Sequence, residues 1–280
     1  MTLRQLIRPR WRIGIVDNSL EGIVGGEELR VQWPANPFHD RWFADPFIVS
    51  VKDNEVKLLV EDYRYADDIG RISRIIVDME RNSIVSCKAV LVGRHFSFPA
   101  IMRKDGKIYV YPEQGRQGKL DIYEYDEKND VCQYVKTLSK EPFTDAIIYN
   151  NVIFSTKLPE PNGKRLWMKP TPNPSQKGRE VSNLELDVLN TPKVYTFEEC
   201  IARNAGDFFE CNGKVYRPAQ ESNQWYGNAL SIQEFRTNEF SEVRRIPGLH
   251  TLNSYQGVTV VDRKVFPFKW VYRLLRRTDK

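Results

Sequence analysis

The sequence predicts an all-β fold, a five-bladed β-propeller whose ring is closed by an N-terminal strand. Three observations support it: short β-rich runs separated by turn residues, a near absence of long helical patterns, and a hairpin unit that recurs about every 50 residues. Five such units nearly fill the 280 residues, so residues 1–280 are predicted to form a single propeller domain. A two-sheet sandwich has the same strand content, but the regular recurrence of the hairpin favours the propeller.

Each predicted hairpin has an apolar strand, a turn rich in Asn, Asp or Gly, and a second strand that ends in polar residues. The five hairpins are, in order, Asp45–Asp62, Phe98–Glu113, Thr144–Lys157, Ala205–Gln220 and Tyr255–Trp270. Their turns recur about 52, 45, 62 and 50 residues apart, a spacing typical of propeller blades. The predicted blades cover approximately residues 40–82, 83–130, 131–180, 181–240 and 241–270, the last completed by residues 11–17.

The segments outside the hairpins complete the prediction. The strand WRIGIVD, residues 11–17, joins the last blade and removes the exposed edge that an open array would leave. The Pro- and Asn-rich segment 169–180 is predicted to be a surface loop between the third and fourth blades. Helical patterns occur only near the two ends of the chain.

The last residues form a basic amphipathic pattern, in which Arg273, Arg276, Arg277 and Lys280 alternate with apolar side chains. Such a helix is suited to peripheral contact with an anionic membrane surface. The alternative is a solvated last turn that packs on the propeller.

Composition excludes several function classes. A net charge of +5, from 42 basic and 37 acidic residues, is spread along the chain and does not predict a nucleic-acid partner. Apolar runs of about six to eight residues are too short to span a bilayer, and the first residues lack the pattern of a secretion signal. The four cysteines have no metal-ligand spacing and are interpreted as reduced thiols in a cytoplasmic protein. With three histidines, no metal and no cofactor are predicted, and carboxylates are expected to carry any chemistry; a metal on the propeller axis is the alternative.

Three carboxylates are the candidates for catalysis: Asp45, Glu113 and Asp145. The first strand of each blade lines the central channel, so acids at the inner ends of different blades converge. Like charges and burial then separate their pKa values, which prepares an acid and a base. In the structural alternatives, Asp45 only starts a strand, Glu113 pairs with Arg116 at a surface tip, and Asp145 caps a turn.

Eight further side chains at the inner ends are predicted to contact a substrate: Glu61, His95, Arg203, Arg217, Gln220, His250, Trp42 and Tyr226. Guanidinium groups suit anionic groups, and aromatic faces suit sugar rings. The alternatives are ion pairs between blades for the cationic members, an ion pair with Arg64 for Glu61 and a structural hydrogen bond for His95.

Several motifs occur in a fixed order: ADPF, HFSFP, TDA, RNAG and HTLN. This set resembles the five-bladed propeller glycosidases and, more closely, the N-terminal propeller domain of plant glucosamine inositolphosphorylceramide transferases and its bacterial relatives. The resemblance covers about residues 42–260. It implies that Asp45 acts as base or nucleophile and that Asp145 orients the substrate. The glycosidase E-G-P segment that carries the general acid is replaced by RNAGDFF, which leaves Glu113 as the best replacement.

The resemblance implies a carbohydrate-active protein of cell-surface glycan metabolism that cleaves or transfers a glycosyl group of a sugar or glycoconjugate, as a hydrolase, phosphorylase or transferase. The alternative is a non-catalytic glycan-binding or scaffold propeller that serves a separate glycosyltransferase or formyltransferase. The missing E-G-P acid favours the second hypothesis, and the retained acids favour the first.

Overall fold

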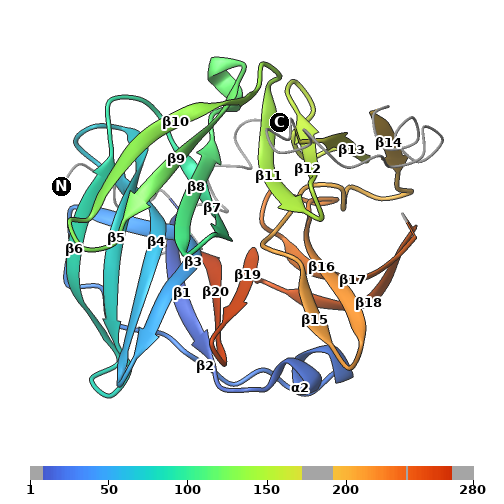
Figure 1. The fold of residues 1–280 in the computed structure, drawn as a ribbon. Helices are drawn as coiled ribbons and strands as arrows, with labels where there is room; N and C mark the ends of the chain where they lie inside the picture. The colour runs from blue at the N-terminus through green and yellow to red at the C-terminus, as the bar shows by residue number, and fades with distance from the viewer. Residues whose placement is uncertain (1–8, 172–191, 238, 267–280) are drawn as a thin grey trace, which may run out of the picture.

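The computed structural model describes residues 9–171, 192–237 and 239–266. These residues form a five-bladed β-propeller, as predicted: five antiparallel sheets of four strands each surround a central axis (Figure 1). The strands that lie innermost are heavily buried because apolar side chains on both faces of a blade pack against neighbouring blades.

The strands follow one another around the ring. Blade one contains β3 (Arg41–Lys52), β4 (Glu55–Arg64), β5 (Ile69–Asp78) and β6 (Ser83–Leu91). Blade two contains β7 (Ser97–Lys104), β8 (Lys107–Glu113), β9 (Leu120–Asp126) and β10 (Val131–Ser139). Blade three contains β11 (Phe143–Tyr149), β12 (Val152–Lys157), β13 (Arg165–Pro170) and β14 (Lys193–Thr196). Blade four contains β15 (Phe209–Cys211), β16 (Lys214–Glu221), β17 (Ala229–Arg236) and β18 (Glu239–Pro247).

Blade five is built from both ends of the described chain. It contains β19 (Thr251–Tyr255), β20 (Val258–Val265), β1 (Arg10–Val16) and β2 (Val31–Gln32). Strand β1 pairs with β20 over its whole length, from Arg10 opposite Val265 to Val16 opposite Thr259. The predicted closure of the ring by the N-terminal strand is therefore confirmed.

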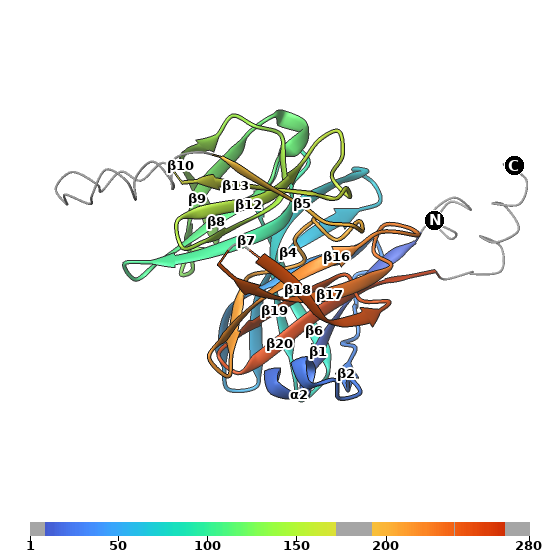
Figure 2. The same ribbon diagram turned by 90° about the vertical axis from the view of Figure 1, so that its right-hand side faces the viewer.

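A short helix, α2 (Leu20–Gly25), connects β1 to β2 and was not predicted. The Ser19 side chain accepts a hydrogen bond from the Gly22 N–H at its start, and Gly26 ends it in the left-handed conformation. A 3₁₀ turn (Gly115–Gln117) follows β8. Both views place α2 beside β2 at one end of the ring (Figure 1 and Figure 2).

The blades extend further along the chain than the sequence predicted. Strand β6 lies in blade one, although the predicted second blade began at residue 83, and β10 lies in blade two, although the predicted third began at residue 131. The outer strands explain the error, since β10 is largely exposed and has a weak apolar pattern. The repeated hairpin marks only the two inner strands of each blade.

Two further expectations need correction. The segment 169–180 does not separate blades three and four, because it begins in β13 and precedes β14 of the same sheet; residues 172–180 lie outside the described part. The fifth hairpin turns at Gln256 and Gly257, earlier than the spacing of about 50 residues predicted. As a result Asp262 lies within β20, well away from the turn.

The helical patterns at residues 3–7 and 270–277, together with the basic residues predicted to contact a membrane, lie outside the described residues. Within the described part, no helix is long and apolar enough to cross a membrane. The four cysteines are free thiols.

Candidate functional site

The innermost strands of three blades carry a residue in the left-handed conformation at the same place. These residues are Asp45 in β3 with φ of 50°, Phe98 in β7 with φ of 43° and Asp145 in β11 with φ of 46°. In each case the pairing with the second strand shifts register beside that residue. Such a bulge turns the strand locally, and aspartate tolerates the conformation better than most residues.

The bulge N–H groups bind carboxylates of the preceding blade. The Asp45 N–H donates to Asp262 Oδ2 of blade five at 2.9 Å. The Phe98 N–H donates to Asp45 Oδ2 at 3.2 Å, and the Asp145 N–H donates to Glu113 Oε2 at 3.2 Å. Inner-end carboxylates therefore link successive blades, so the predicted catalytic acids also hold the centre of the ring together.

Arg203 of blade four organises one side of this centre. Its Nε and Nη2 donate to the two oxygens of Asp145 at 2.6 and 3.1 Å, and Nη2 also donates to Glu113 Oε2 at 3.0 Å. Nη1 donates to Asn162 Oδ1 at 2.9 Å. The forked guanidinium thus binds Asp145 with two parallel hydrogen bonds, a geometry that fixes the carboxylate strongly.

The two acids on Arg203 have opposite pKa displacements. Burial raises the pKa of Glu113 well above its ordinary value, against the opposing charge of Arg203, and the negative Asp145 adds to the rise. Burial also acts to raise the pKa of Asp145, but Arg203 and the hydrogen bonds from Arg203 and Glu113 outweigh it and leave the pKa lowered. The Glu113, Arg203 and Asp145 side chains are 13%, 11% and 2% exposed. An acid with a raised pKa that retains some contact with solvent therefore lies beside an acid with a lowered pKa.

Asp45 and His250 form the other side of the centre. His250 Nδ1 lies 3.5 Å from Asp45 Oδ1 and 3.2 Å from Asp262 Oδ1, while His250 Nε2 and the Tyr226 hydroxyl are 2.9 Å apart. Burial raises the pKa of Asp45 well above its ordinary value, and the charges of Asp262 and Glu61 raise it further. Thr251 stabilises Asp262 through its N–H and its hydroxyl, each 2.8 Å from Oδ1.

Glu61, in β4 opposite Ala44, belongs to the same electrostatic group. Burial, followed by the charges of Asp145 and Asp262, raises the pKa of Glu61 to about 8. Gly70 makes room for its carboxyl group, since a Cβ atom there would lie 2.3 Å from Glu61 Oε1. Arg64, the alternative partner from the sequence, instead pairs with Asp40 and Asp67.

We call these residues the axial cluster: Asp45, Glu61, Glu113, Asp145, Arg203, His250 and Asp262.

Gln220 and Arg217 support the axial cluster from behind, since neither side chain reaches the surface. Gln220 Nε2 donates to Asp145 Oδ2 at 2.6 Å and to the Asn204 carbonyl at 2.8 Å. Arg217 donates to Asn204 Oδ1 at 2.8 Å, to Gln233 and to the Ala202 carbonyl, and burial lowers its pKa to about 9. Arg217 was predicted to contact a substrate, but it lies buried among neutral acceptors, where it positions Asn204.

His95 and Trp42 contact Gly70 and Tyr63, respectively. His95 Nδ1 accepts a hydrogen bond from the Gly70 N–H at 3.0 Å, and burial, together with the charge of Arg116, lowers the pKa of His95. This is the structural alternative considered for that histidine. Trp42 stacks on Tyr63 with the ring planes 4° apart and lines a cavity at the edge of blade five.

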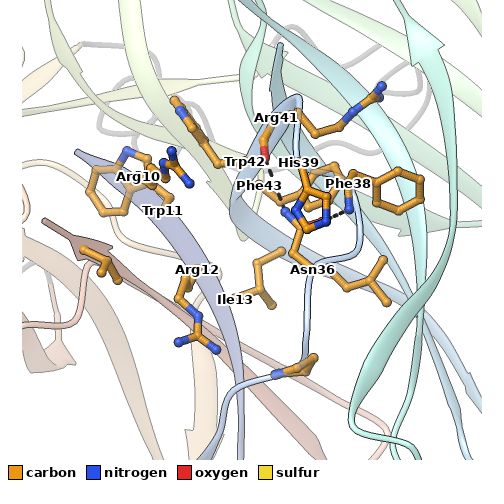
Figure 3. A pocket seen from close by; sticks show the side chains of 13 residues that line it. Arg10, Trp11, Arg12, Ile13, Asn36, Phe38, His39, Arg41, Trp42 and Phe43 are labelled. Atoms are coloured by element: carbon orange, nitrogen blue, oxygen red, sulfur yellow. Dashed lines mark hydrogen bonds between the residues drawn. The ribbon is translucent and has the colours of Figure 1, made fainter. Parts of the chain in front are cut away.

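That cavity, of about 340 Å³, lies between β1 and the segment 34–43, and the carboxylates of the axial cluster do not line it (Figure 3). Trp11 lines it and also packs on the axial cluster, with its ring centroid 4.3 Å from that of His250. The cavity and the acids are thus separate neighbours that share one aromatic side chain.

Asp45, His250 and Asp262 could hold a cation, because one ligand atom from each lies within 4.8 Å of the others. Asp45 Oδ1 accepts no hydrogen bond from the described residues. Two carboxylates and an imidazole are common ligands of divalent metals. This group was not predicted from the sequence, because the fifth turn was expected too late in the chain and Asp262 was therefore overlooked.

Besides Asp262, the site contains a second residue that was not predicted from the sequence, Asn162. Asn162 binds Arg203 from the loop between β12 and β13 and has no recurring motif around it. Asp262 was detectable, because it follows the apolar run VTVV in the second strand of its hairpin, as Glu61 follows LLV.

Comparisons with known proteins agree with this fold. No protein-family model matches the chain. It is 23% identical over 183 residues to glucosamine inositolphosphorylceramide transferase 1 of Arabidopsis thaliana and 23% identical over 165 residues to the protein of that name from Oryza sativa subsp. indica. These matches cover 59% and 55% of this chain but only 22% and 21% of the two relatives. The chain is therefore distantly homologous to about a fifth of each transferase.

Solved structures of glycosidases share the architecture. The catalytic domain of a Coprinopsis cinerea family 62 α-L-arabinofuranosidase has a TM-score of 0.54 and 8% identity, covering 83% of this chain and 96% of that one. A family 43 β-xylosidase/α-arabinofuranosidase from a compost metagenome has a TM-score of 0.51 and 12% identity, covering 81% and 91%. A family 117 glycoside hydrolase of Zobellia galactanivorans has a TM-score of 0.50 and 9% identity, covering 94% and 92%. This chain is a five-bladed propeller that resembles these glycosidases.

Proposed function

We propose that this protein binds a sugar or glycoconjugate over the axial cluster and cleaves or transfers a glycosyl group, with Glu113 as the proton donor. The observation that carries the proposal is that Arg203 binds both Glu113 and Asp145 at the centre of the ring, where the pKa of Glu113 is raised and that of Asp145 is lowered. Two neighbouring titratable groups with separated pKa values are the usual signature of an acid and a charged partner.

In this proposal each acid has a distinct task. Neutral Glu113 donates its proton to the glycosidic oxygen as the bond to the anomeric carbon breaks. Asp145 stays anionic on Arg203 and Gln220, where it orients substrate hydroxyls and keeps Glu113 protonated. Asp45, once ionised, accepts the proton of the incoming water, phosphate or sugar hydroxyl, with His250 Nδ1 3.5 Å away to stabilise the carboxylate.

Three observations support this assignment of class. Solved structures that share the architecture include glycosidases of families 43, 62 and 117, and the curated relatives are transferases by name. The acids implied by the family resemblance, Asp45 and Asp145, lie at equivalent bulges of two blades. A cytoplasmic location and a role in cell-surface glycan synthesis remain part of the proposal.

The test is turnover of a panel of aryl glycosides, glycosyl phosphates and nucleotide sugars, read by mass spectrometry. Glu113→Gln should abolish turnover on any substrate found. Glu124→Gln, which changes an exposed acid in β9 of the same blade, is the matched control and should retain activity. Full activity of the Glu113→Gln variant would remove Glu113 as proton donor.

A second candidate function is a non-catalytic glycan-binding propeller that serves a separate glycosyltransferase. One observation favours it: Arg203, in the RNAG segment that replaces the E-G-P acid, occupies both Glu113 and Asp145 with hydrogen bonds. In that case glycans should bind to the protein, as measured by isothermal titration calorimetry, without turnover, and Arg203→Gln should weaken binding.

A further inference from the structure

The cavity between β1 and the segment 34–43, here called the seam cavity, is lined by basic and aromatic side chains. Arg10, Trp11 and Arg12 extend from β1 on one side, and His39 and Trp42 belong to the other side (Figure 3). No acidic residue lines it within the described part of the chain. Its character is therefore cationic, in contrast to the acidic axial cluster nearby.

Two of its arginines have no carboxylate partner among the described residues. Arg10 lies over the Tyr65 ring, 5.6 Å from the centroid, and its Nε is buried with no hydrogen-bond acceptor in the described part of the chain. Arg12 is exposed, lies 6.0 Å from the Trp33 ring centroid and donates to the Trp33 carbonyl at 3.2 Å. A buried donor without an acceptor is costly, so Arg10 gains more than a surface arginine would from an anionic ligand.

The neighbouring cations strengthen this field. Arg263 faces Arg12 across the β1–β20 pair and stacks on Trp33, 3.8 Å from the ring centroid. Arg41 also lines the seam cavity, but its charge is balanced by Asp40 and Asp62. The uncompensated charge is thus concentrated on β1 and β20, where aromatic rings hold the arginines in place.

We propose that the seam cavity binds the phosphate or carboxylate group of an anionic sugar, through the Arg10 and Arg12 guanidinium groups. A forked guanidinium binds both anions with paired hydrogen bonds, and Trp11 and Trp42 offer flat faces for a sugar ring. A volume of about 340 Å³ suits a monosaccharide that carries one such group.

The location connects this site to the axial cluster. Trp11 lines the seam cavity and packs on His250 and Tyr226, with ring centroids 4.3 and 5.9 Å apart. The seam cavity and the axial cluster therefore share the Trp11 side chain. The inference rests on the proposed function for the identity of the ligand as a sugar, and it narrows the substrate class to anionic glycans.

The experiment measures binding directly by isothermal titration calorimetry on the full chain. The probes are glucose 6-phosphate, glucuronate, neutral glucose and inorganic phosphate. We expect glucose 6-phosphate or glucuronate to bind at least about tenfold more tightly than glucose. Tighter binding of one of these two probes identifies phosphate or carboxylate as the recognised anion, and inorganic phosphate alone shows how much affinity the sugar adds.

The variants locate that binding. Arg10→Gln combined with Arg12→Gln should weaken the preferred anionic sugar by about tenfold or more. Arg12→Gln alone changes an exposed side chain that the fold does not need, so its weaker but measurable loss guards against misfolding of the double variant. Arg81→Gln, which removes an arginine that is 77% exposed and pairs with Asp78, is the matched control and should bind like the unaltered chain.

Two results would overturn the inference: anionic sugars that bind no better than glucose, or an arginine double variant with undiminished affinity. Failure of the proposed function looks different. In that case the unaltered chain still binds anionic sugars and loses this affinity on replacement of Arg10 and Arg12, because neither arginine belongs to the axial cluster. Anion binding without any turnover would therefore contradict only the proposed function.

Discussion

The buried acids on the two sides of the axial cluster have different charged neighbours and different pKa shifts. On one side, Arg203 binds Asp145 and Glu113 directly, and the pKa of Asp145 is lowered. On the other side, the charges around Asp45 come from Asp262 and Glu61, and its pKa is raised by burial and by those charges. Burial acts to raise the pKa on both sides. Asp145, which accepts two hydrogen bonds from Arg203, has a lowered pKa, whereas Glu113, which accepts one, keeps a raised pKa.

The comparison also shows that a buried acid is not in itself a sign of chemistry. Asp62 is as buried as the axial acids, but its Oδ2 accepts hydrogen bonds from Arg41, Arg71 and Ser73, which bind this carboxylate within blade one. Its neighbour Glu61 points to the opposite face of β4 and meets other acids instead. One residue along a strand separates a structural carboxylate from a member of the axial cluster.

The largest effect on stability is expected when Arg203 is removed from the side of the axial cluster that contains Asp145 and Glu113. Arg203→Gln leaves Asp145 and Glu113 buried without a guanidinium group, so the free energy of unfolding should fall by about 3–5 kcal/mol at neutral pH. Urea denaturation monitored by tryptophan fluorescence measures this change.

Arg236→Gln is the control for that experiment, because Arg236 is 68% exposed and pairs with Glu234 at the surface of blade four. Its loss should cost less than about 1 kcal/mol. If Arg203→Gln cost no more than this control, the axial acids would be stable without Arg203, and the contrast between the two sides would disappear.

A smaller effect on stability, with a distinct pH dependence, is expected when Glu61 is changed on the side of the axial cluster that contains Asp45. The pKa of Glu61 is raised to about 8 in the folded state, above its ordinary value of 4.5. Between these values the unfolded chain ionises Glu61 while the fold keeps it neutral, so stability falls as the pH rises. Glu61→Gln removes this loss and should stabilise the protein by on the order of 2 kcal/mol at pH 8, with little gain near pH 4.

Urea denaturation at a series of pH values measures the gain from Glu61→Gln. Glu55→Gln, an exposed change on the same strand, should show no such pH dependence. A constant difference between Glu61→Gln and the unaltered chain at all pH values would mean that Glu61 titrates normally in the fold.

Four of the five axial acids, Asp45, Glu61, Glu113 and Asp145, were predicted because they lie at the inner ends of recognisable hairpins, whereas Asp262 was overlooked. Asp45 and Asp145 were found from the residues beside their own strands, without knowledge of their partners. The partners were harder to predict, since Glu113 binds Arg203 of blade four and the sequence suggested Arg116 only three residues away. Closure of the ring brings residues that are distant in sequence into contact, and a local sequence motif does not indicate which side chains of another blade it will contact.

The seam cavity shows the same limit more strongly. Its two sides come from β1 and from the segment that leads into blade one, and β1 takes its place only by pairing with β20 at the far end of the chain. Periodicity predicted that β1 closes the ring. The direction in which Arg10 and Arg12 point depends on the register of β1 against β20. A hydrophobic pattern specifies which side chains of a strand are buried, but it does not specify what the exposed side chains contact.

The smallest effect in the comparison is expected at the Tyr226 hydroxyl, which contacts His250 Nε2 at 2.9 Å. Tyr226→Phe removes one hydrogen bond but keeps the ring that packs on Trp11 and lies 5.1 Å from the Arg203 guanidinium carbon. The free energy of unfolding should therefore fall by about 0.5–1.5 kcal/mol.

Tyr134→Phe, which removes an exposed hydroxyl bonded to Thr137 on the outer strand β10, is the control and should lower the free energy of unfolding by less. Urea denaturation of the two variants, side by side, measures the difference. A loss above about 3 kcal/mol for Tyr226→Phe would show that the His250 side depends on its hydrogen bonds as strongly as the other side depends on Arg203.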